Sequence, residues 1–168
     1  FSNVYLTKFL FINEKHSMYL NLFGLSTYLL MTPMCAYIFD TSNSRVYMLR
    51  SLIIILLFSP LSFYMFQTRE YILLIFSTFL LATMFSLISG SQHAFSQNLF
   101  PVKARYRGIS ISYNTGSCLL GGTAPLIITS LIDKYENLMM PAYYLMIQVF
   151  LAYILIRWAL KSSHKTFS

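Results

Sequence analysis

Five apolar runs, each long enough to form a membrane-spanning helix, dominate this sequence. A transmembrane helix needs about 20 mostly apolar residues, and the runs cover about 17–39, 48–66, 71–97, 108–132 and 141–160. Residues 1–12 look like the last part of a sixth, truncated helix. The segments between the runs are short and hold most of the charged residues. This pattern predicts an all-α membrane protein with about five full transmembrane helices and one truncated helix.

The composition excludes a soluble domain. Only 10% of the residues are charged and 57% are hydrophobic, whereas a soluble domain carries about 25% charged residues. A net charge of +7 would suit nucleic acid only if the basic residues shared one soluble face. They lie instead in the short gaps between apolar runs. We therefore expect the lipid bilayer, and no nucleic acid, as a partner.

The charges in the gaps predict an orientation. Loops on the cytoplasmic side of a membrane carry an excess of Lys and Arg. Alternate gaps form one set with eight basic residues and one acid, Asp40, and a second set with four basic and four acidic residues. The basic residues of the first set are Arg45, Arg50, Lys103, Arg105, Arg107, Arg157, Lys161 and Lys165. The first set, and with it the C-terminus, is predicted to be cytoplasmic.

Enzymatic chemistry has little support in this sequence. All five acids fall at helix ends or in loops, and no catalytic triad, HExxH motif or carboxylate pair is present. Cys35 and Cys118 lie in apolar runs and are interpreted as small buried hydrophobes. Gln148 is alone in the last run and is interpreted as an interhelical hydrogen-bonding group. The sequence thus predicts no enzyme, no cofactor and no metal site.

A first polar cluster, "SGSQHAFSQN", occupies residues 89–98. It contains Gln92, a candidate for lining a substrate cavity, and His93, whose side-chain type titrates near neutral pH. At about 1.5 Å per residue from Tyr71, His93 should lie near the cytoplasmic interface. Two interpretations stay open: a hydrated interfacial histidine, or a proton-linked or gating residue.

A second polar cluster, "SISYNTGSCLLGGTAP", occupies residues 110–125. Its small residues recur four positions apart, which allows another helix to approach closely. Alternatively, Gly121, Gly122 and Pro125 interrupt the helix, as in helices that line transporter cavities. On that interpretation the polar side chains line a substrate cavity with Gln92. These candidates are Tyr113, Asn114, Ser117 and Thr123.

The pattern "FP…RYRG…YN…GGTAP" followed by "MMPAYY" resembles the C-terminal half of major facilitator superfamily transporters. Within that superfamily it is similar to the metabolite:proton symporters, and most to bacterial proline/betaine transporters. The resemblance extends over the whole chain. It implies that the five runs correspond to helices eight to twelve of the twelve-helix fold, and residues 1–12 to the end of helix seven.

A cytoplasmic motif of the same family, G-x-x-x-D-x-x-G-R-[RK], is partly retained in "AYIFDTSNSR". Asp40 and Arg45 match the motif, whereas Ala36 and Asn43 replace glycines and Ser44 replaces the first arginine. The resemblance implies a cytoplasmic charge network that closes and reopens during transport. Its candidate members are Asp40, Arg45, Arg105 and Arg107.

The resemblance implies a secondary active transporter in a bacterial inner membrane. Its substrate would be a small osmolyte or metabolite such as proline or betaine, carried by symport with protons. In such proteins two halves rock around a central site, and this chain supplies at most one half. We therefore expect it to be inactive alone and to need a separate N-terminal half. The alternative is a non-transporting membrane fragment, or an interaction protein that pairs with a separately encoded half.

Overall fold

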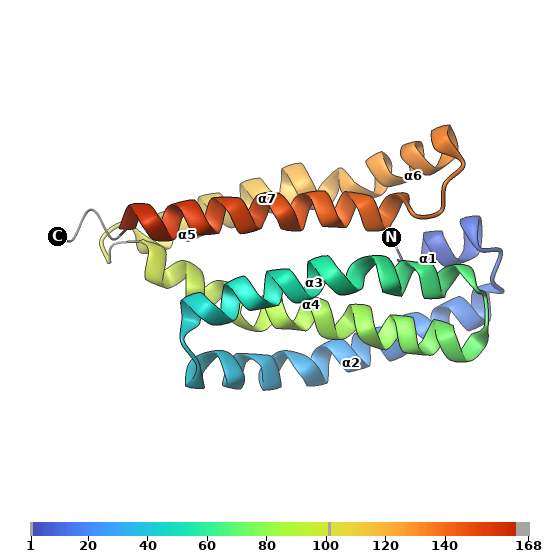
Figure 1. The fold of residues 1–168 in the computed structure, drawn as a ribbon, viewed down its shortest axis with the longest axis horizontal. Coiled ribbons are helices and arrows are strands. Elements are labelled where there is room, and N and C mark those ends of the chain that lie inside the picture. Colours follow the sequence, from blue (N-terminus) through green and yellow to red (C-terminus); the bar gives the residue numbers. More distant parts are fainter. Residues whose placement is uncertain (1, 101, 164–168) are drawn as a thin grey trace.

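The computed structural model describes residues 2–100 and 102–163, and they form a bundle of helices along one long axis (Figure 1). No strand occurs among these residues, so the predicted all-α fold class is confirmed. The elements are α1 (Ser2–Val4), the π-helix η1 (Tyr5–Phe9), α2 (Glu14–Thr41), α3 (Ser44–Gln67), α4 (Tyr71–Leu99), α5 (Arg105–Gly116), the π-helix η2 (Ser117–Gly122), α6 (Ala124–Tyr135) and α7 (Met140–Ser163).

Five helices are long and apolar enough to cross a membrane, as the apolar runs predict. They are Glu14–Thr41, Ser44–Gln67, Tyr71–Gln97, Arg105–Tyr135 and Met140–Ala159. The fourth consists of α5, η2 and α6, which continue one another without a loop. In the bundle α4 contacts both α2 and α3, and α3 also contacts α7 (Figure 1).

Two asparagines fix where the first two long helices begin. The side chain of Asn13 accepts a hydrogen bond from the backbone N–H of Lys15 at the start of α2. Asn43 accepts from the backbone N–H groups of Arg45 and Val46 at the start of α3. Such caps satisfy N–H groups that have no partner inside the helix. Asn43, which replaces a motif glycine, therefore has a structural role of its own.

Glycine allows α2 and α4 to pack closely. A Cβ atom on Gly90 would lie 2.7 Å from the backbone oxygen of Thr32 and 2.9 Å from the backbone nitrogen of Ala36. A Cβ atom on Gly24 would lie 2.9 Å from the methyl group of Thr78. A hydrogen bond from the Tyr28 hydroxyl to Ser89 Oγ, 2.5 Å long, also joins the two helices.

The N-terminal segment belongs to the core at one end of the bundle. Tyr5, Leu6 and Leu10 are buried in the same apolar cluster as Phe63 and Phe66 of α3. Leu20 of α2, Leu74 of α4, Ile128 and Ile132 of α6 and Ala142 of α7 also belong to this cluster. The segment predicted as the end of a truncated helix thus packs, through Tyr5, Leu6 and Leu10, in one core with five later helices.

Two further contacts hold the N-terminal segment in place. The Tyr5 hydroxyl donates a 2.8 Å hydrogen bond to the backbone oxygen of Leu138, just before α7. Lys8 and Asp133 form an exposed ion pair with 3.7 Å between charged atoms. Because exposed pairs are solvent-screened and contribute little, the apolar cluster and the Tyr5 bond are the main attachments.

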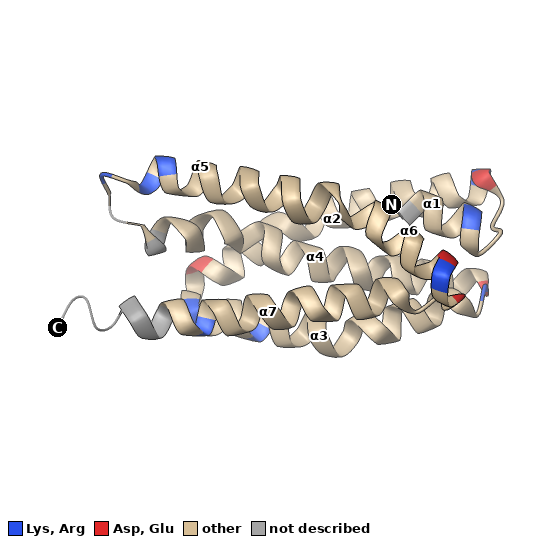
Figure 2. Ribbon diagram, turned by 90° about the horizontal axis from the view of Figure 1, so that it is seen from above, with Lys and Arg blue, Asp and Glu red and all other residues tan. Residues whose placement is uncertain are grey.

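Charged residues lie towards the two ends of the bundle (Figure 2). The end where α2, α4 and α7 finish carries Asp40 as its only described acid. Its described basic residues are Arg45, Arg50, Lys103, Arg105, Arg107 and Arg157. Lys161 and Lys165, assigned to the same end from the sequence, lie outside the residues whose side chains are described. The opposite end carries basic and acidic residues together, including the Lys8–Asp133 pair.

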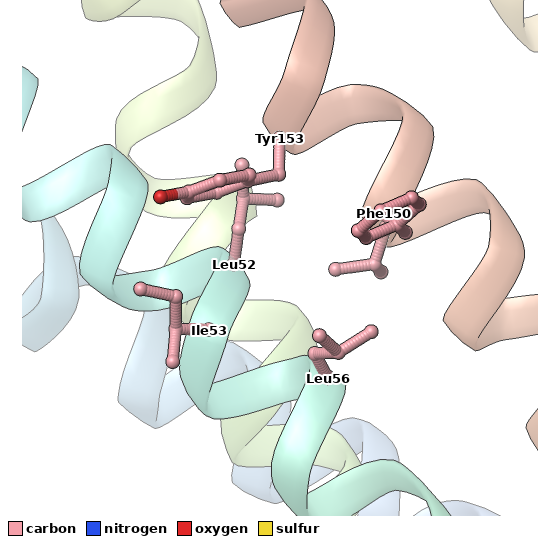
Figure 3. Close-up of a pocket in the computed structure, with 6 residues that line it drawn as sticks. Leu52, Ile53, Leu56, Phe150 and Tyr153 are labelled. Carbon is pink, nitrogen blue, oxygen red and sulfur yellow. The ribbon is translucent and has the colours of Figure 1, made fainter. Parts of the chain in front are cut away.

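A small apolar cavity separates parts of α3 and α7. Figure 3 shows Leu52, Ile53 and Leu56 of α3 facing Phe150 and Tyr153 of α7. The cavity measures about 90 Å³ and its lining surface is almost entirely apolar. Because ligand sites need polar groups to fix orientation, we interpret this cavity as a gap in helix packing.

Candidate functional site

The two polar clusters predicted from the sequence meet where α4 ends and α5 begins. A cavity of about 180 Å³ lies there, with walls from both helices. We call it the His93 cavity, and its lining residues are Gln92, His93, Ser96, Phe100, Ile109, Ser112 and Tyr113. The rings of His93 and Tyr113 are in contact, with centroids 5.5 Å apart and planes inclined by 42°.

A glycine brings these two helices into position. The chain reverses direction between Leu99 and Arg105, and Phe100 at the turn lies against Gly108 of α5. A Cβ atom on Gly108 would lie 2.5 Å from two carbons of the Phe100 ring. Any larger residue at position 108 would therefore displace this ring from the cavity wall.

The lining of the His93 cavity is suited to polar chemistry. It combines an imidazole, an amide, a phenol and two serine hydroxyls, which supply both hydrogen-bond donors and acceptors. One of these groups is already engaged, because Ser96 Oγ donates to the Gln92 backbone oxygen at 2.6 Å. None of the described residues that line the cavity is a carboxylate, so any proton held there would reside on the imidazole.

The structure separates the other candidate cavity residues from Gln92 and Tyr113. The side chains of Asn114 and Ser117 are exposed, and neither residue lines the His93 cavity. Thr123 is partly buried, and its hydroxyl donates to the backbone oxygen of Leu119. The five candidates therefore form two groups. Gln92 of α4 and Tyr113 of α5 line the cavity. The other three, Asn114, Ser117 and Thr123, lie farther along the helix that α5, η2 and α6 form.

The helix that carries this second group is irregular. Residues Ser117–Gly122 form the π-helix η2, and Pro125 lies in the first turn of α6. Pro125 lacks a backbone N–H, so it cannot donate the helical bond to the carbonyl of Gly121. Cβ atoms on Gly121 or Gly122 would meet only Ser117 of the same helix, at 3.8 and 3.9 Å. Among the described residues, no other element lies within 4 Å of the added Cβ atoms.

The expectation that Cys118 is buried is wrong. Cys35 is buried, but Cys118 is exposed. Neither α5 nor η2 contains a buried residue, because these elements pack weakly against the rest of the described chain. The open surface of α5 and η2 therefore includes Tyr113, with 52% of its surface exposed, as well as Asn114 and Ser117.

The candidate gating residues share one end of the bundle. Asp40 lies in the last turn of α2, Arg45 in the first turn of α3, and Arg105 and Arg107 in the first turn of α5. These helix ends lie on the same side of the molecule in Figure 1. Asp40, Arg45 and Arg107 are exposed, whereas Arg105 is partly buried. The Nε atom of Arg105 is buried without a hydrogen-bond partner.

A polar groove between α2 and α4 was not anticipated from the sequence. It encloses about 400 Å³, and its polar lining residues are Asn21, Tyr28, Thr78 and Ser89. The spacing of its α2 residues in the sequence could have indicated this groove. Asn21, Gly24 and Tyr28 lie three and four positions apart, a spacing that places residues on one helix face. None of the described residues of η1 or α6 lines this groove.

Five apolar helices with polar cavities along their ends and faces are the architecture of a multi-pass membrane protein. Comparison with known proteins indicates which membrane proteins this chain resembles. The chain is 39% identical over 67 residues to the ectoine/proline transporter ProP of Corynebacterium glutamicum, which is 40% of this chain and 13% of that relative. It is 33% identical over 66 residues to the proline/betaine transporter of Escherichia coli strain K12, covering 39% of this chain and 13% of the relative.

A third relative, a putative proline/betaine transporter of Staphylococcus aureus, is 40% identical over 47 residues, or 28% of this chain and 10% of the relative. The predicted resemblance to proline/betaine transporters is thus confirmed over up to 40% of the chain, and its extension over the whole chain stays a prediction. These relatives are named as transporters, not as enzymes. The aligned stretches span a small part of the relatives' length. No family model matches the chain, and no solved structure matches it.

Proposed function

We propose that this chain is part of a secondary active transporter. Its substrate would be a small osmolyte such as proline or betaine, carried with protons across a bacterial inner membrane. The observation that carries the proposal is the similarity to relatives named as proline, betaine and ectoine transporters. Five helices of membrane-spanning length and composition support it. Membership of the major facilitator superfamily, with this chain as part of the C-terminal half, is included in the proposal.

The polar surface of α5 and η2 is the proposed contribution of this chain to the substrate path. Asn114 and Ser117 are exposed on a segment that also exposes Ser112, Tyr113 and Thr115. Polar groups that face hydrocarbon without a partner are costly, so we expect this surface to face a water-filled cavity. The irregular backbone of η2 agrees with this, because non-helical backbone at membrane depth is tolerated where it lines such a cavity.

The His93 cavity is the proposed proton-linked site. His93 is the one titratable side chain other than tyrosine among its lining residues, and its own side chain is exposed. A proton could therefore enter from outside this chain. The charged end with Asp40, Arg45, Arg105 and Arg107 is the proposed cytoplasmic gate, and the C-terminus lies on that side according to the excess of basic residues.

A central site between two halves cannot close when one wall is absent. We therefore propose that the chain transports only together with a complementary N-terminal half. The test is uptake of labelled proline and glycine betaine into cells that lack their own osmolyte transporters. The chain is expressed alone, or with the N-terminal half of a proline/betaine transporter, and each culture is measured with and without a protonophore.

We expect uptake only in the co-expressing cells, and we expect the protonophore to abolish it. Uptake that persists with the protonophore would overturn proton symport. Uptake by the chain alone would overturn the need for a second half. If neither culture takes up substrate although both chains reach the membrane, the transport proposal fails. The interaction-protein alternative would then be favoured.

A further inference from the structure

A larger cavity lies inside the bundle and contains none of the polar residues proposed above for substrate or protons. It encloses about 490 Å³ and has walls from η1, α3, α4, η2, α6 and α7. Cavities that hold small molecules measure about 300–1,000 Å³. We call it the aromatic cavity, and the lining residues that carry the argument are Tyr5, Phe63, Phe66, Phe85, Tyr144 and Gln148.

Gln148 is the unusual member of this lining. Its Nε2 atom is buried and has no hydrogen-bond partner in the structure, so this amide group does not make the interhelical bond expected from the sequence. A buried donor without a partner costs about 1–3 kcal/mol, and native proteins retain few such groups. A ligand with an acceptor oxygen in the cavity would satisfy this donor.

The rest of the lining restricts the ligand further. None of the described residues that line the aromatic cavity carries a charge. A ligand with a net charge would lose its hydration without compensation, whereas a zwitterion is neutral overall. Five lining residues are aromatic: Tyr5, Phe63, Phe66, Phe85 and Tyr144. Aromatic rings attract alkylated ammonium groups through cation–π interactions, which strengthen when the cation is desolvated.

The aromatic cavity also adjoins the groove between α2 and α4. Phe66, Leu81 and Phe85 line both spaces, so these three side chains form a shared wall. Phe85 is 46% exposed and is therefore accessible to a molecule that enters from the groove. The groove supplies polar partners at this point, among them Thr78 and Ser89. A hydrated ligand in the groove would thus lie next to one wall of the aromatic cavity, at Phe85.

We propose that the aromatic cavity binds a small zwitterion with an alkylated ammonium group. Gln148 Nε2 donates to its carboxylate, and the aromatic rings surround its cation. This inference rests on the proposed function, because it assigns the osmolyte a site within this chain. It differs from the surface of α5 and η2 and makes Gln148 a residue that determines specificity.

The test measures binding, which does not require transport. The purified chain is placed in lipid nanodiscs, and labelled glycine betaine is bound at equilibrium. Gln148→Leu removes the donor and should weaken binding about five- to hundredfold, the equivalent of losing one hydrogen bond to a charged group. Gln67→Leu is the matched control, because Gln67 Nε2 is also buried without a partner but Gln67 does not line the cavity. It should leave binding unchanged.

A second comparison uses choline, which has the same cation but no carboxylate. The unmodified chain should bind betaine at least fivefold more tightly than choline, and Gln148→Leu should reduce that preference. Phe85→Leu should weaken the binding of both. The proposal is overturned if the unmodified chain does not bind betaine or binds both ligands equally. It is also overturned if Gln148→Leu keeps the preference undiminished. Should this variant fail to fold, the betaine–choline comparison in the unmodified chain decides.

The outcomes also separate this inference from the transport proposal. Uptake by the assembled transporter that is unaltered in Gln148→Leu would overturn the aromatic-cavity site and leave transport standing. Binding of betaine that depends on Gln148, without any uptake, would overturn transport and leave the binding site standing.

Discussion

The imidazole ring of His93 lies against the phenol ring of Tyr113, with 5.5 Å between their centroids. The two residues belong to different helices, α4 and α5, which are joined by a short basic segment. A change in the charge or position of His93 would therefore act directly on the first residue of the proposed substrate surface. This contact links the proposed proton site to the proposed substrate path.

Our first prediction concerns His93. His93→Gln keeps a polar side chain but cannot carry a proton, so uptake by the assembled transporter should no longer respond to an inward proton gradient. His16→Gln is the control, because the His16 ring also contacts a tyrosine, Tyr71, with 5.7 Å between centroids. That pair lies at the other end of the bundle. The measurement is initial uptake rate in proteoliposomes with and without a pH gradient. An unaltered gradient response in His93→Gln would remove the residue from proton coupling.

The number and course of the long helices could be predicted because hydropathy is a property of each segment alone. Their ends were less well predicted. The first full run was expected at about 17–39, whereas α2 extends over Glu14–Thr41. The difference arises because capping residues such as Asn13 and the first turn of a helix are polar. An apolar run therefore ends before the helix does.

The candidate site was predicted only in part, because contacts between helices depend on packing. The sequence indicated Gln92 and Tyr113 as candidates for a substrate cavity and His93 as a separate proton-linked candidate, and all three line one cavity in the structure. Nothing in the sequence indicated the aromatic cavity, because its walls come from six elements that are distant in sequence. The error at Cys118 has the same origin. An apolar run indicates burial in protein or lipid without distinguishing them.

The second prediction concerns the packing of α2 on α4. Gly90→Ala would place a methyl group 2.7 Å from the Thr32 backbone oxygen, and the two backbones would have to separate. Such overpacking costs about 1–3 kcal/mol, so the purified chain should lose its folded form at a lower temperature. Gly116→Ala is the control, because nothing lies within 4 Å of the added Cβ atom. The measurement is the fraction of monodisperse protein after heating, by size-exclusion chromatography. Equal stability of the two variants would contradict the close approach.

The third prediction concerns the attachment of the N-terminal segment. Tyr5→Phe keeps the ring contact with Phe63, at 5.8 Å between centroids, but removes the hydrogen bond to the Leu138 oxygen. The loss should lower the free energy of unfolding by about 0.5–1.5 kcal/mol. The control is Tyr64→Phe, because Tyr64 is 63% exposed. The same heating assay distinguishes them, and no difference between the two variants would show that the bond contributes nothing.

The fourth prediction concerns orientation. Ser44 begins α3 at the basic end of the bundle, and Asn137 lies between α6 and α7 at the opposite end. In a background that lacks Cys35 and Cys118, Ser44→Cys should react with a membrane-impermeant thiol reagent only from the cytoplasmic side. Asn137→Cys should react only from the outside. Inside-out and right-side-out vesicles provide the two measurements. Labelling of Asn137→Cys from the cytoplasmic side would reverse the proposed topology.

The fifth prediction concerns Asn114, whose side chain is exposed on α5. Asn114→Ala should not lower the stability of this chain. In the assembled transporter, two roles for the amide predict different results. A hydrogen bond that only joins helices in a membrane contributes about 0.6 kcal/mol, so its loss would reduce the amount of assembled protein slightly and leave substrate affinity unchanged. A ligand contact leaves its partner unpaired when lost, at a cost of about 1–3 kcal/mol.

We expect Asn114 to contact the substrate. Asn114→Ala should then show a five- to hundredfold weaker apparent affinity for substrate at normal expression. The measurement is the substrate concentration dependence of uptake, with the amount of transporter determined by immunoblot. Gly122→Leu offers no discrimination, because it would block the path under either role. Ser130→Ala is a suitable control, because Ser130 is also exposed but lies on α6, one turn or more beyond the irregular segment. Normal expression with unaltered affinity in Asn114→Ala would remove this residue from the substrate path.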